Sequence, residues 1–256
     1  MPDDVVGDRW RSQPREVIVQ PDANAVLRST ADRLIGELIA QQSGAEPVHI
    51  CVTGGGMGQA LWPVLLGREA VESIDWAGVH VWFSDERFVP SGHPERNDKA
   101  LLAVADALGL SAANVHCIPG PDRAPDVTAA AMQYAVELAS WAPSDATIEA
   151  PDFFVSLLGI GPDGHVASLF PGDRTDESAT VISVVDAPKP PPQRVSFTRA
   201  TLRNCVQLWF VAVGEEKADA VGRALEGDDP VHTPAAGVSG RDITLWFIDE
   251  ALAASL

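Results

Sequence analysis

The chain has 256 residues, of which 46% are hydrophobic and 21% charged, a composition typical of a globular protein with a sizeable core. Its formal net charge of −18 argues against nucleic-acid binding and against contact with an anionic membrane, since both require clustered Lys and Arg. The opening MPDDVVGDRW lacks the apolar core of a signal peptide, no run reaches membrane-spanning length, and three cysteines occur singly, so we expect a cytoplasmic protein with reduced thiols.

Short apolar strands alternate with helical segments through the first half of the chain. A polar lead-in over residues 1–20 ends in a predicted strand at Glu16–Val19, and Asp22 is placed to cap a helix over residues 23–42. The further predicted elements are a strand at Val48–Val52, a glycine-rich turn at Thr53–Gly58, a helix at Gln59–Leu66, a strand at Val79–Phe83, and helices near Asn97–Leu108 and Thr128–Trp141.

The second half continues this alternation. Its predicted elements are a strand at Phe153–Leu158, a β-like run at Val181–Val185, a proline-rich loop at Pro188–Pro192, a strand at Val206–Val213, a helix at Glu215–Leu225 and a strand at Asp242–Ile248. Alternating strands and helices indicate parallel strands joined by helical crossovers. We therefore predict an α/β fold: a single three-layer αβα domain over residues 1–256 with a mostly parallel, wound sheet.

Glycines follow the strand Val48–Val52 in the run TGGGMG. The backbone amides of Gly54, Gly55 and Gly56, together with the positive end of the following helix, are suited to cradling an anion. The run is not a nucleotide-binding P-loop, because no Gly-Lys-Ser/Thr follows it. A tight turn without a ligand is the alternative.

Polar residues also follow the strand Val79–Phe83, in the run SDERFVP. Arg87 is suited to holding an anion or a developing oxyanion, with Asp85 or Glu86 orienting it. A surface ion-pair cluster would have the same sequence. Asn97, a few residues further on, is a candidate either for the same site or for the cap of the next helix.

The stretch LLGIGPDGHVASLFPG at residues 157–172 carries the strongest signal in the chain. His165 titrates near neutral pH and is suited to taking a proton from water, while Asp163 can fix its tautomer. The glycines also match the dinucleotide pattern G-x-G-x-x-G, with Asp186 about 20 residues later. Pro171 follows too soon for the helix that this pattern requires, so we expect no nicotinamide cofactor. A histidine with a purely structural place in the loop is the other possibility.

Two cations, Lys189 and Arg194, lie in the proline-rich run KPPPQR. Prolines stiffen such a loop and hold both charges at low entropic cost, which fits phosphate binding. A rigid surface loop fits the run equally well. No histidine spacing typical of a metal site, no nucleotide motif and no G-x-S-x-G serine nucleophile motif is present. The combined residues therefore indicate attack of water on a small phosphorylated molecule.

The same residues resemble the 6-phosphogluconolactonase family. The resemblance covers nearly the whole chain and is carried by TGGGMG, SDERFVP with Asn97, LLGIGPDGHVASLFPG, APKPPPQRVSFTRATLRN and DITLWFIDEAL. It implies a fold like those of glucosamine-6-phosphate deaminase and ribose-5-phosphate isomerase. It also implies a carboxylic-ester hydrolase of the oxidative pentose phosphate pathway that converts 6-phospho-D-glucono-1,5-lactone to 6-phosphogluconate without a cofactor. Apart from the resemblance, we expect a monomer.

The resemblance further implies roles for individual residues. His165 would be the general base and Asp163 its support, and Arg87 with Asp85 would contact the substrate or its developing charge. The substrate and its phosphate would be held by Gly54, Gly55, Gly56, Lys189, Arg194 and Asn97. Two departures affect binding: Gly56-Met57-Gly58 replaces the Ser-Thr-Pro of many relatives, and Arg199-Ala200 replaces a usual Leu-Pro. A sugar-phosphate isomerase or deaminase, and a non-catalytic sugar-phosphate sensor, are the competing hypotheses.

Overall fold

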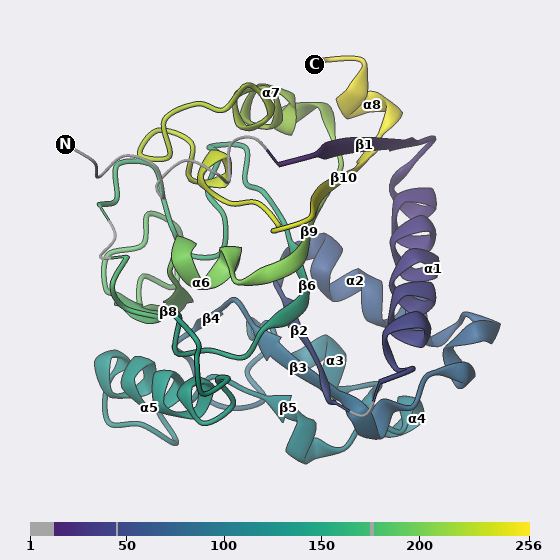
Figure 1. Ribbon diagram of the computed structural model, residues 1–256. Coiled ribbons are helices and arrows are strands. Elements are labelled where there is room, and N and C mark those ends of the chain that lie inside the picture. The colour runs from purple at the N-terminus through teal and green to yellow at the C-terminus, as the bar shows by residue number, and fades with distance from the viewer. Residues whose placement is uncertain (1–12, 45, 175–176) are drawn as a thin grey trace.

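Seven parallel strands form the central sheet, in the order β1-β10-β9-β6-β2-β3-β5 (Figure 1). The computed structural model describes residues 13–44, 46–174 and 177–256. The strands are β1 Arg15–Gln20, β2 Val48–Val52, β3 Val79–Phe83, β5 Val115–His116, β6 Phe153–Leu158, β9 Cys205–Ala212 and β10 Ile243–Asp249. Every residue of β2 and β3 is buried, as expected for parallel strands covered on both faces. The predicted α/β fold with a mostly parallel sheet and flanking helices is confirmed.

Helices connect these strands and cover the sheet. They are α1 Ala23–Gln41, α2 Gly55–Leu66, α3 Lys99–Leu102, α4 Ala105–Leu108, α5 Val127–Ala139, α6 Arg199–Arg203, α7 Ala218–Glu226 and α8 Glu250–Ala253, with short 3-10 turns at Glu69–Ser73, Trp76–Gly78, Ala112–Asn114, Glu215–Lys217 and Pro234–Gly237. The Asp22 side chain accepts the Ala25 amide, so the predicted cap begins α1. α1 packs beside α2 and along β10, as Figure 1 shows.

A second sheet corrects the sequence prediction around the polar runs. It contains three antiparallel strands in the order β4-β8-β7, with β4 at Asp85–Arg87, β8 at Arg194–Phe197 and β7 at Val181–Val184. Only the β7 run was predicted as a strand. β4 and β8 were missed because each is short and polar at the site end, so that pairing rather than propensity makes them strands.

Two predicted helix boundaries are also wrong. The predicted helix Asn97–Leu108 is divided into α3 and α4, because Val104 has a φ of −118° and its amide donates to the carbonyl of Leu101, three residues back. α2 begins at Gly55 rather than Gln59, so the glycines form its first turn. The polar lead-in predicted for residues 1–12 lies outside the described residues.

A continuous buried cluster joins the sheet to its helices, with Trp62, Trp82 and Trp209 among its largest fully buried side chains. Burial of this apolar surface is the main favourable contribution to folding. Within the described ranges, no helix has the length and apolar character needed to cross a membrane.

The parallel direction of the strands brings four loops together. The segments that follow β2, β3, β6 and β9 all begin at the carboxyl edge of the sheet, and these strands are neighbours in the order β9-β6-β2-β3. Open α/β sheets bind ligands at this edge. The loops after these strands carry the glycine turn, the run SDER, the run PDGH and Lys217.

Candidate active site

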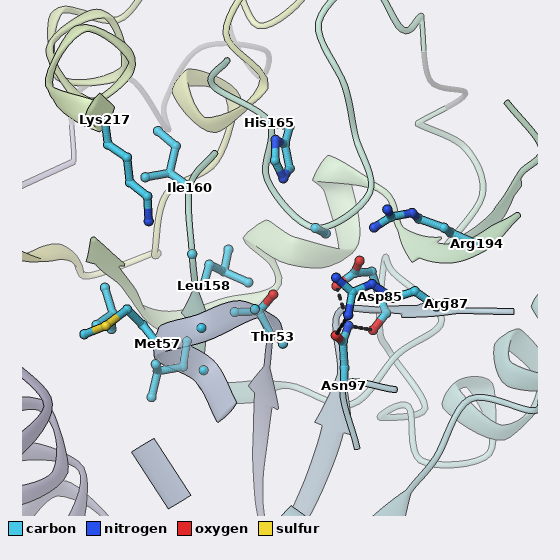
Figure 2. A pocket seen from close by; sticks show the side chains of 18 residues that line it. Thr53, Met57, Asp85, Arg87, Asn97, Leu158, Ile160, His165, Arg194 and Lys217 are labelled. Atoms are coloured by element: carbon cyan, nitrogen blue, oxygen red, sulfur yellow. Dashed lines mark hydrogen bonds between the residues drawn. The ribbon is translucent and has the colours of Figure 1, made fainter. Parts of the chain in front are cut away.

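A pocket lies among these four loops and the second sheet (Figure 2). Its walls combine backbone of the glycine turn with cationic, carboxylate and imidazole side chains. The lining residues are Thr53, Gly54, Gly55, Gly56, Met57, Gly58, Asp85, Arg87, Asn97, Leu157, Leu158, Gly159, Ile160, His165, Ala167, Arg194, Val211 and Lys217. Most of the residues predicted for the site therefore do meet in one place, although they are up to 140 positions apart in sequence (Gly54 to Arg194).

His165 lines the pocket, and Asp163 lies behind its ring. Nδ1 of His165 is 2.5 Å from Oδ1 of Asp163. An ionised carboxylate only accepts hydrogen bonds, so this contact places the hydrogen on Nδ1 and leaves the lone pair on Nε2. Burial lowers the pKa of His165 below its ordinary value, and Asp163 acts in the opposite direction. The lowered pKa favours the neutral ring, the form that can accept a proton.

The charge of Asp163 is maintained by its neighbours. Burial alone would raise the pKa of this carboxyl, but the hydrogen bond from His165 and the contact with Lys189 together lower it to about 2. Asp163 is consequently an anion throughout the range in which His165 titrates. It can stabilise the imidazolium that forms when His165 accepts a proton.

The loop that presents His165 depends on backbone shape. Gly164 has a φ of +91°, and a Cβ there would lie 2.9 Å from Cγ2 of Thr233, so only glycine fits without a shift. The Gly164 carbonyl accepts the amide of Ala235, which fixes the loop to the segment before β10. Val166 and Leu169 then pair in an isolated bridge, so no helix opens after these glycines.

Arg87 and Asp85 come from β4, but they do not contact each other directly. Arg87 Nη1 donates to Oδ1 of Asn97 at 2.8 Å, and Nδ2 of Asn97 donates to the carbonyl of Asp85 at 2.8 Å and to its Oδ1 at 3.2 Å. Asn97 therefore bridges the two residues rather than capping α3, whose N-cap is Asp98. Nε of Arg87 is buried and has no hydrogen-bond partner among the described residues.

Glu86 organises the loop that carries Asn97. Its carboxylate accepts the backbone amides of Arg87, Asn97 and Asp98 at 2.8 to 3.2 Å. Burial raises the pKa of Glu86 to about 7, although the nearby Arg96 and the Asn97 amide oppose the shift. Glu86 thus fixes the backbone of Asn97, and its carboxylate bonds to the amide of Arg87 rather than to the guanidinium.

Arg194 lies directly opposite Arg87 in the β4–β8 pairing. Its guanidinium donates to the carbonyls of Lys189 at 2.9 Å and Pro191 at 3.1 Å, and it lies over the ring of Phe170. Burial lowers the pKa of Arg194, with Asp85 opposing that effect. The two guanidinium groups form a cationic wall beside His165 (Figure 2).

One predicted lysine lies outside the pocket, and another lysine that was not predicted lines it. Lys189 does not line the pocket; its ammonium pairs with Asp163 at 3.1 Å. Lys217, in contrast to Lys189, lines the pocket, and its side chain lies on the same side as Met57 (Figure 2). Lys217 was not among the residues predicted for the site, although its place a few residues after the buried strand β9 was the available signal.

The glycine turn places the start of α2 at the pocket. The first amides of any α-helix lack a partner within the helix, and the cap residue of α2, Gly54, offers no side-chain hydrogen bond. A Cβ on Gly54 would overlap the side chain of Asn97. Glycine at this position therefore lets α2 approach the Arg87–Asn97 pair, and leaves the helix end open to an anion.

Fold and site together define an α/β protein with a histidine-bearing, cation-lined pocket at the carboxyl edge of a parallel sheet. A family model described as "Glucosamine-6-phosphate isomerases/6-phosphogluconolactonase" matches residues 21–246, and the chain belongs to this family. A Streptomyces coelicolor protein named 6-phosphogluconolactonase is 41% identical over 96% of each chain. The protein of that name from Mycobacterium tuberculosis is 39% identical over 92% of this chain and 96% of its own. The resemblance noted from the motifs is confirmed.

Solved structures show the same fold at lower sequence identity. The 6-phosphogluconolactonase of Trypanosoma brucei superimposes with a TM-score of 0.81 at 23% identity, covering 96% of this chain and all of its own. A monomeric glucosamine-6-phosphate deaminase gives a TM-score of 0.74 at 19% identity, covering 94% of this chain and 100% of its own. Proteins named for two different reactions therefore share this scaffold, and the residues of the pocket must distinguish them.

Proposed function

We propose that the protein hydrolyses 6-phospho-D-glucono-1,5-lactone to 6-phosphogluconate, a step of the oxidative pentose phosphate pathway. The observation that carries this proposal is the Asp163–His165 pair, in which Nδ1 bonds to the carboxylate and the ring lines a pocket together with Arg87, Arg194 and Lys217. The names of the relatives that are 41% and 39% identical support the same substrate. A neutral imidazole beside an anion-binding pocket fits attack of water on a phosphorylated lactone.

The first chemical step is proton transfer to His165. Nε2 takes a proton from water as the water oxygen forms a bond to the lactone carbonyl carbon, and the carbonyl oxygen becomes an oxyanion. Asp163 stabilises the resulting imidazolium through Nδ1. Arg87 is the proposed oxyanion partner, because its side chain brings a positive charge to the wall of the same pocket that His165 lines.

The second step opens the ring. The tetrahedral intermediate collapses, the bond between the carbonyl carbon and the ring oxygen breaks, and His165 returns its proton to that oxygen. The same group thus acts first as base and then as acid. The new carboxyl group ionises in solution, so that turnover releases one proton.

The phosphate is proposed to bind at the glycine turn. Backbone amides of Gly54, Gly55 and Gly56 supply donors at the start of α2, and Lys217 and Arg194 supply charge. This arrangement supports binding without the hydroxyl groups of the Ser-Thr-Pro that many relatives carry. Asp85 and Asn97 are proposed to hold Arg87 and the sugar hydroxyls.

Acid release from freshly prepared 6-phosphogluconolactone tests the proposal. In a pH-stat, with spontaneous hydrolysis subtracted, the wild-type protein is expected to release acid and His165→Ala to lose about 10²–10⁴-fold of the rate. His93→Ala is the matched control, because His93 lies outside the pocket. An inactive wild type, or a fully active His165→Ala, would overturn the proposal, and ammonia release from glucosamine 6-phosphate would favour the deaminase instead.

A further inference from the structure

Lys189 is held behind the Asp163–His165 pair, away from the pocket. Its Nζ is 3.1 Å from Oδ2 of Asp163 and 3.3 Å from Nδ1 of His165. The carbonyl of Lys189 accepts the Arg194 guanidinium at 2.9 Å, so the backbone that carries the ammonium is fixed. The Ala187 amide closes the same loop by donating to the carbonyl of Pro192.

The hydrogen bonds of Asp163 are divided between two partners. Oδ1 accepts from the imidazole and Oδ2 accepts from Lys189. Because Nδ1 already carries the hydrogen that it donates to Asp163, it has no lone pair for Lys189. The contact between Nζ and Nδ1 therefore brings a full positive charge beside the ring without a hydrogen bond.

We propose that Lys189 is a positioning residue for the Asp163–His165 pair. Its ammonium fixes the carboxylate against the ring and opposes the formation of the imidazolium. This inference rests on the proposed function of His165 as the base. It replaces the role in phosphate binding that the sequence predicted for Lys189. The pocket, lined by Arg87, Arg194 and Lys217, has its own cations for the phosphate.

Four influences act on the charge of the His165 ring. Burial and Lys189 disfavour the imidazolium, whereas Asp163 and the more distant Asp85 favour it. Lys189 thereby offsets part of the effect of the carboxylates. An imidazole balanced in this way stays neutral at lower pH, and its imidazolium gives up its proton more readily to the departing ring oxygen.

Lys189→Met tests this role, because Met keeps the length of the side chain and removes its charge. The acid limb of the kcat/KM–pH profile is expected to move upward by about half to one pH unit, since a unit charge at this distance from the ring is worth about 1 kcal/mol in water. Lys189→Arg retains the charge and is expected to restore the wild-type limb. Competitive inhibition by inorganic phosphate should be the same in all three proteins.

An NMR titration of the His165 ring gives a readout that does not depend on activity. The midpoint is expected to rise in Lys189→Met and to remain in place in Lys189→Arg. An unchanged midpoint in Lys189→Met would overturn the inference, and phosphate inhibition weakened more than about tenfold at an unchanged midpoint would assign Lys189 to the phosphate. If the wild type hydrolyses no lactone, the proposed function fails, yet the titration still decides whether Lys189 sets the charge of His165.

Discussion

Ser168 donates its hydroxyl hydrogen to Oδ2 of Asp85 at 2.7 Å, and both residues are buried. This bond joins the loop that carries His165 to the strand that carries Arg87. The amide of Ser168 also donates to Oγ of Ser196 on β8, so the loop is attached to two strands of the second sheet. The relative position of base and cations is thus set by buried hydrogen bonds.

Ser168→Ala should damage both stability and catalysis. It leaves an oxygen of Asp85 buried without its donor, which costs about 1–3 kcal/mol of unfolding free energy. Denaturant unfolding and kcat/KM for the lactone measure the two effects. Ser255→Ala, at an exposed hydroxyl near the C-terminus, is the control and should change neither. Wild-type values for both in Ser168→Ala would show that the bond does not order the site.

Arg87→Met should lower kcat more than it raises KM. If Arg87 stabilises the oxyanion, removing its guanidinium costs about 10²–10³-fold in kcat, as for the loss of other oxyanion donors. Arg123→Met is the control, because Arg123 is exposed and lies outside the pocket. A change confined to KM would place Arg87 in ground-state binding instead.

Gly54→Ala should disrupt the Asn97 bridge. The added methyl group would overlap the Asn97 side chain, which must then move away from Arg87 and Asp85. We expect kcat/KM to fall by at least about tenfold, equivalent to roughly 1.4 kcal/mol. A Cβ at Gly56 meets no atom within 4 Å, so Gly56→Ala in the same turn should lose less. Equal losses would remove the steric explanation.

Lys217→Met should weaken phosphate binding with little change in kcat. The loss of a hydrogen bond to a charged group costs about 1.5–3 kcal/mol, so KM should rise about 10–100-fold. Inorganic phosphate should inhibit the variant correspondingly less. Lys99→Met, at an exposed lysine at the start of α3, provides the control. If KM stays constant, the phosphate binds elsewhere in the pocket.

Protonation of His49 should destabilise the fold in acid. Its Nδ1 accepts the indole hydrogen of Trp82 at 3.0 Å, and burial, together with His80 and His116, lowers the pKa of His49 to about 4. A pKa below the unfolded value means stability that is present above pH 6.5 and is lost as the pH falls toward 4, in total on the order of 3 kcal/mol.

His49→Gln removes this titration, and thus the difference in unfolding free energy between wild type and variant should shrink as the pH falls from 7 to 4.5. Glu86 titrates over the same range with the opposite sign, because its raised pKa costs stability as the pH rises. That contribution is common to both proteins and cancels in the difference. His93→Gln is the control at a more exposed histidine. A difference that does not vary with pH would contradict the prediction.

The buried strands were the most predictable part of the fold. The runs at Val79–Phe83 and Phe153–Leu158, apolar at all but one position each, match β3 and β6 at both ends, because parallel strands covered on both faces are mostly apolar. β4 and β8 have no such pattern. Their pairing depends on chain segments more than 100 residues apart, which local sequence does not reveal.

The site was predictable as a set of loops but not as a set of contacts. The rule that ligands bind at the carboxyl ends of parallel strands brought Gly54, Arg87 and His165 together from sequence. It could not show that Asn97 separates Arg87 from Asp85, or that Lys189 turns toward Asp163, since side-chain direction is set by tertiary packing. Lys217 was overlooked because the run that contains it, GEEK at residues 214–217, has the composition of an ordinary solvated helix start.

The uniform direction of the seven strands has a consequence for function. The pocket residues belong to the strand ends at one edge of the sheet, to the loops and the first turn of α2 beyond them, and to the small second sheet, whereas most of the largest buried side chains lie within strands and helices. Pocket side chains can thus change while the parallel sheet beneath them keeps its own apolar contacts. One scaffold can in this way serve more than one reaction.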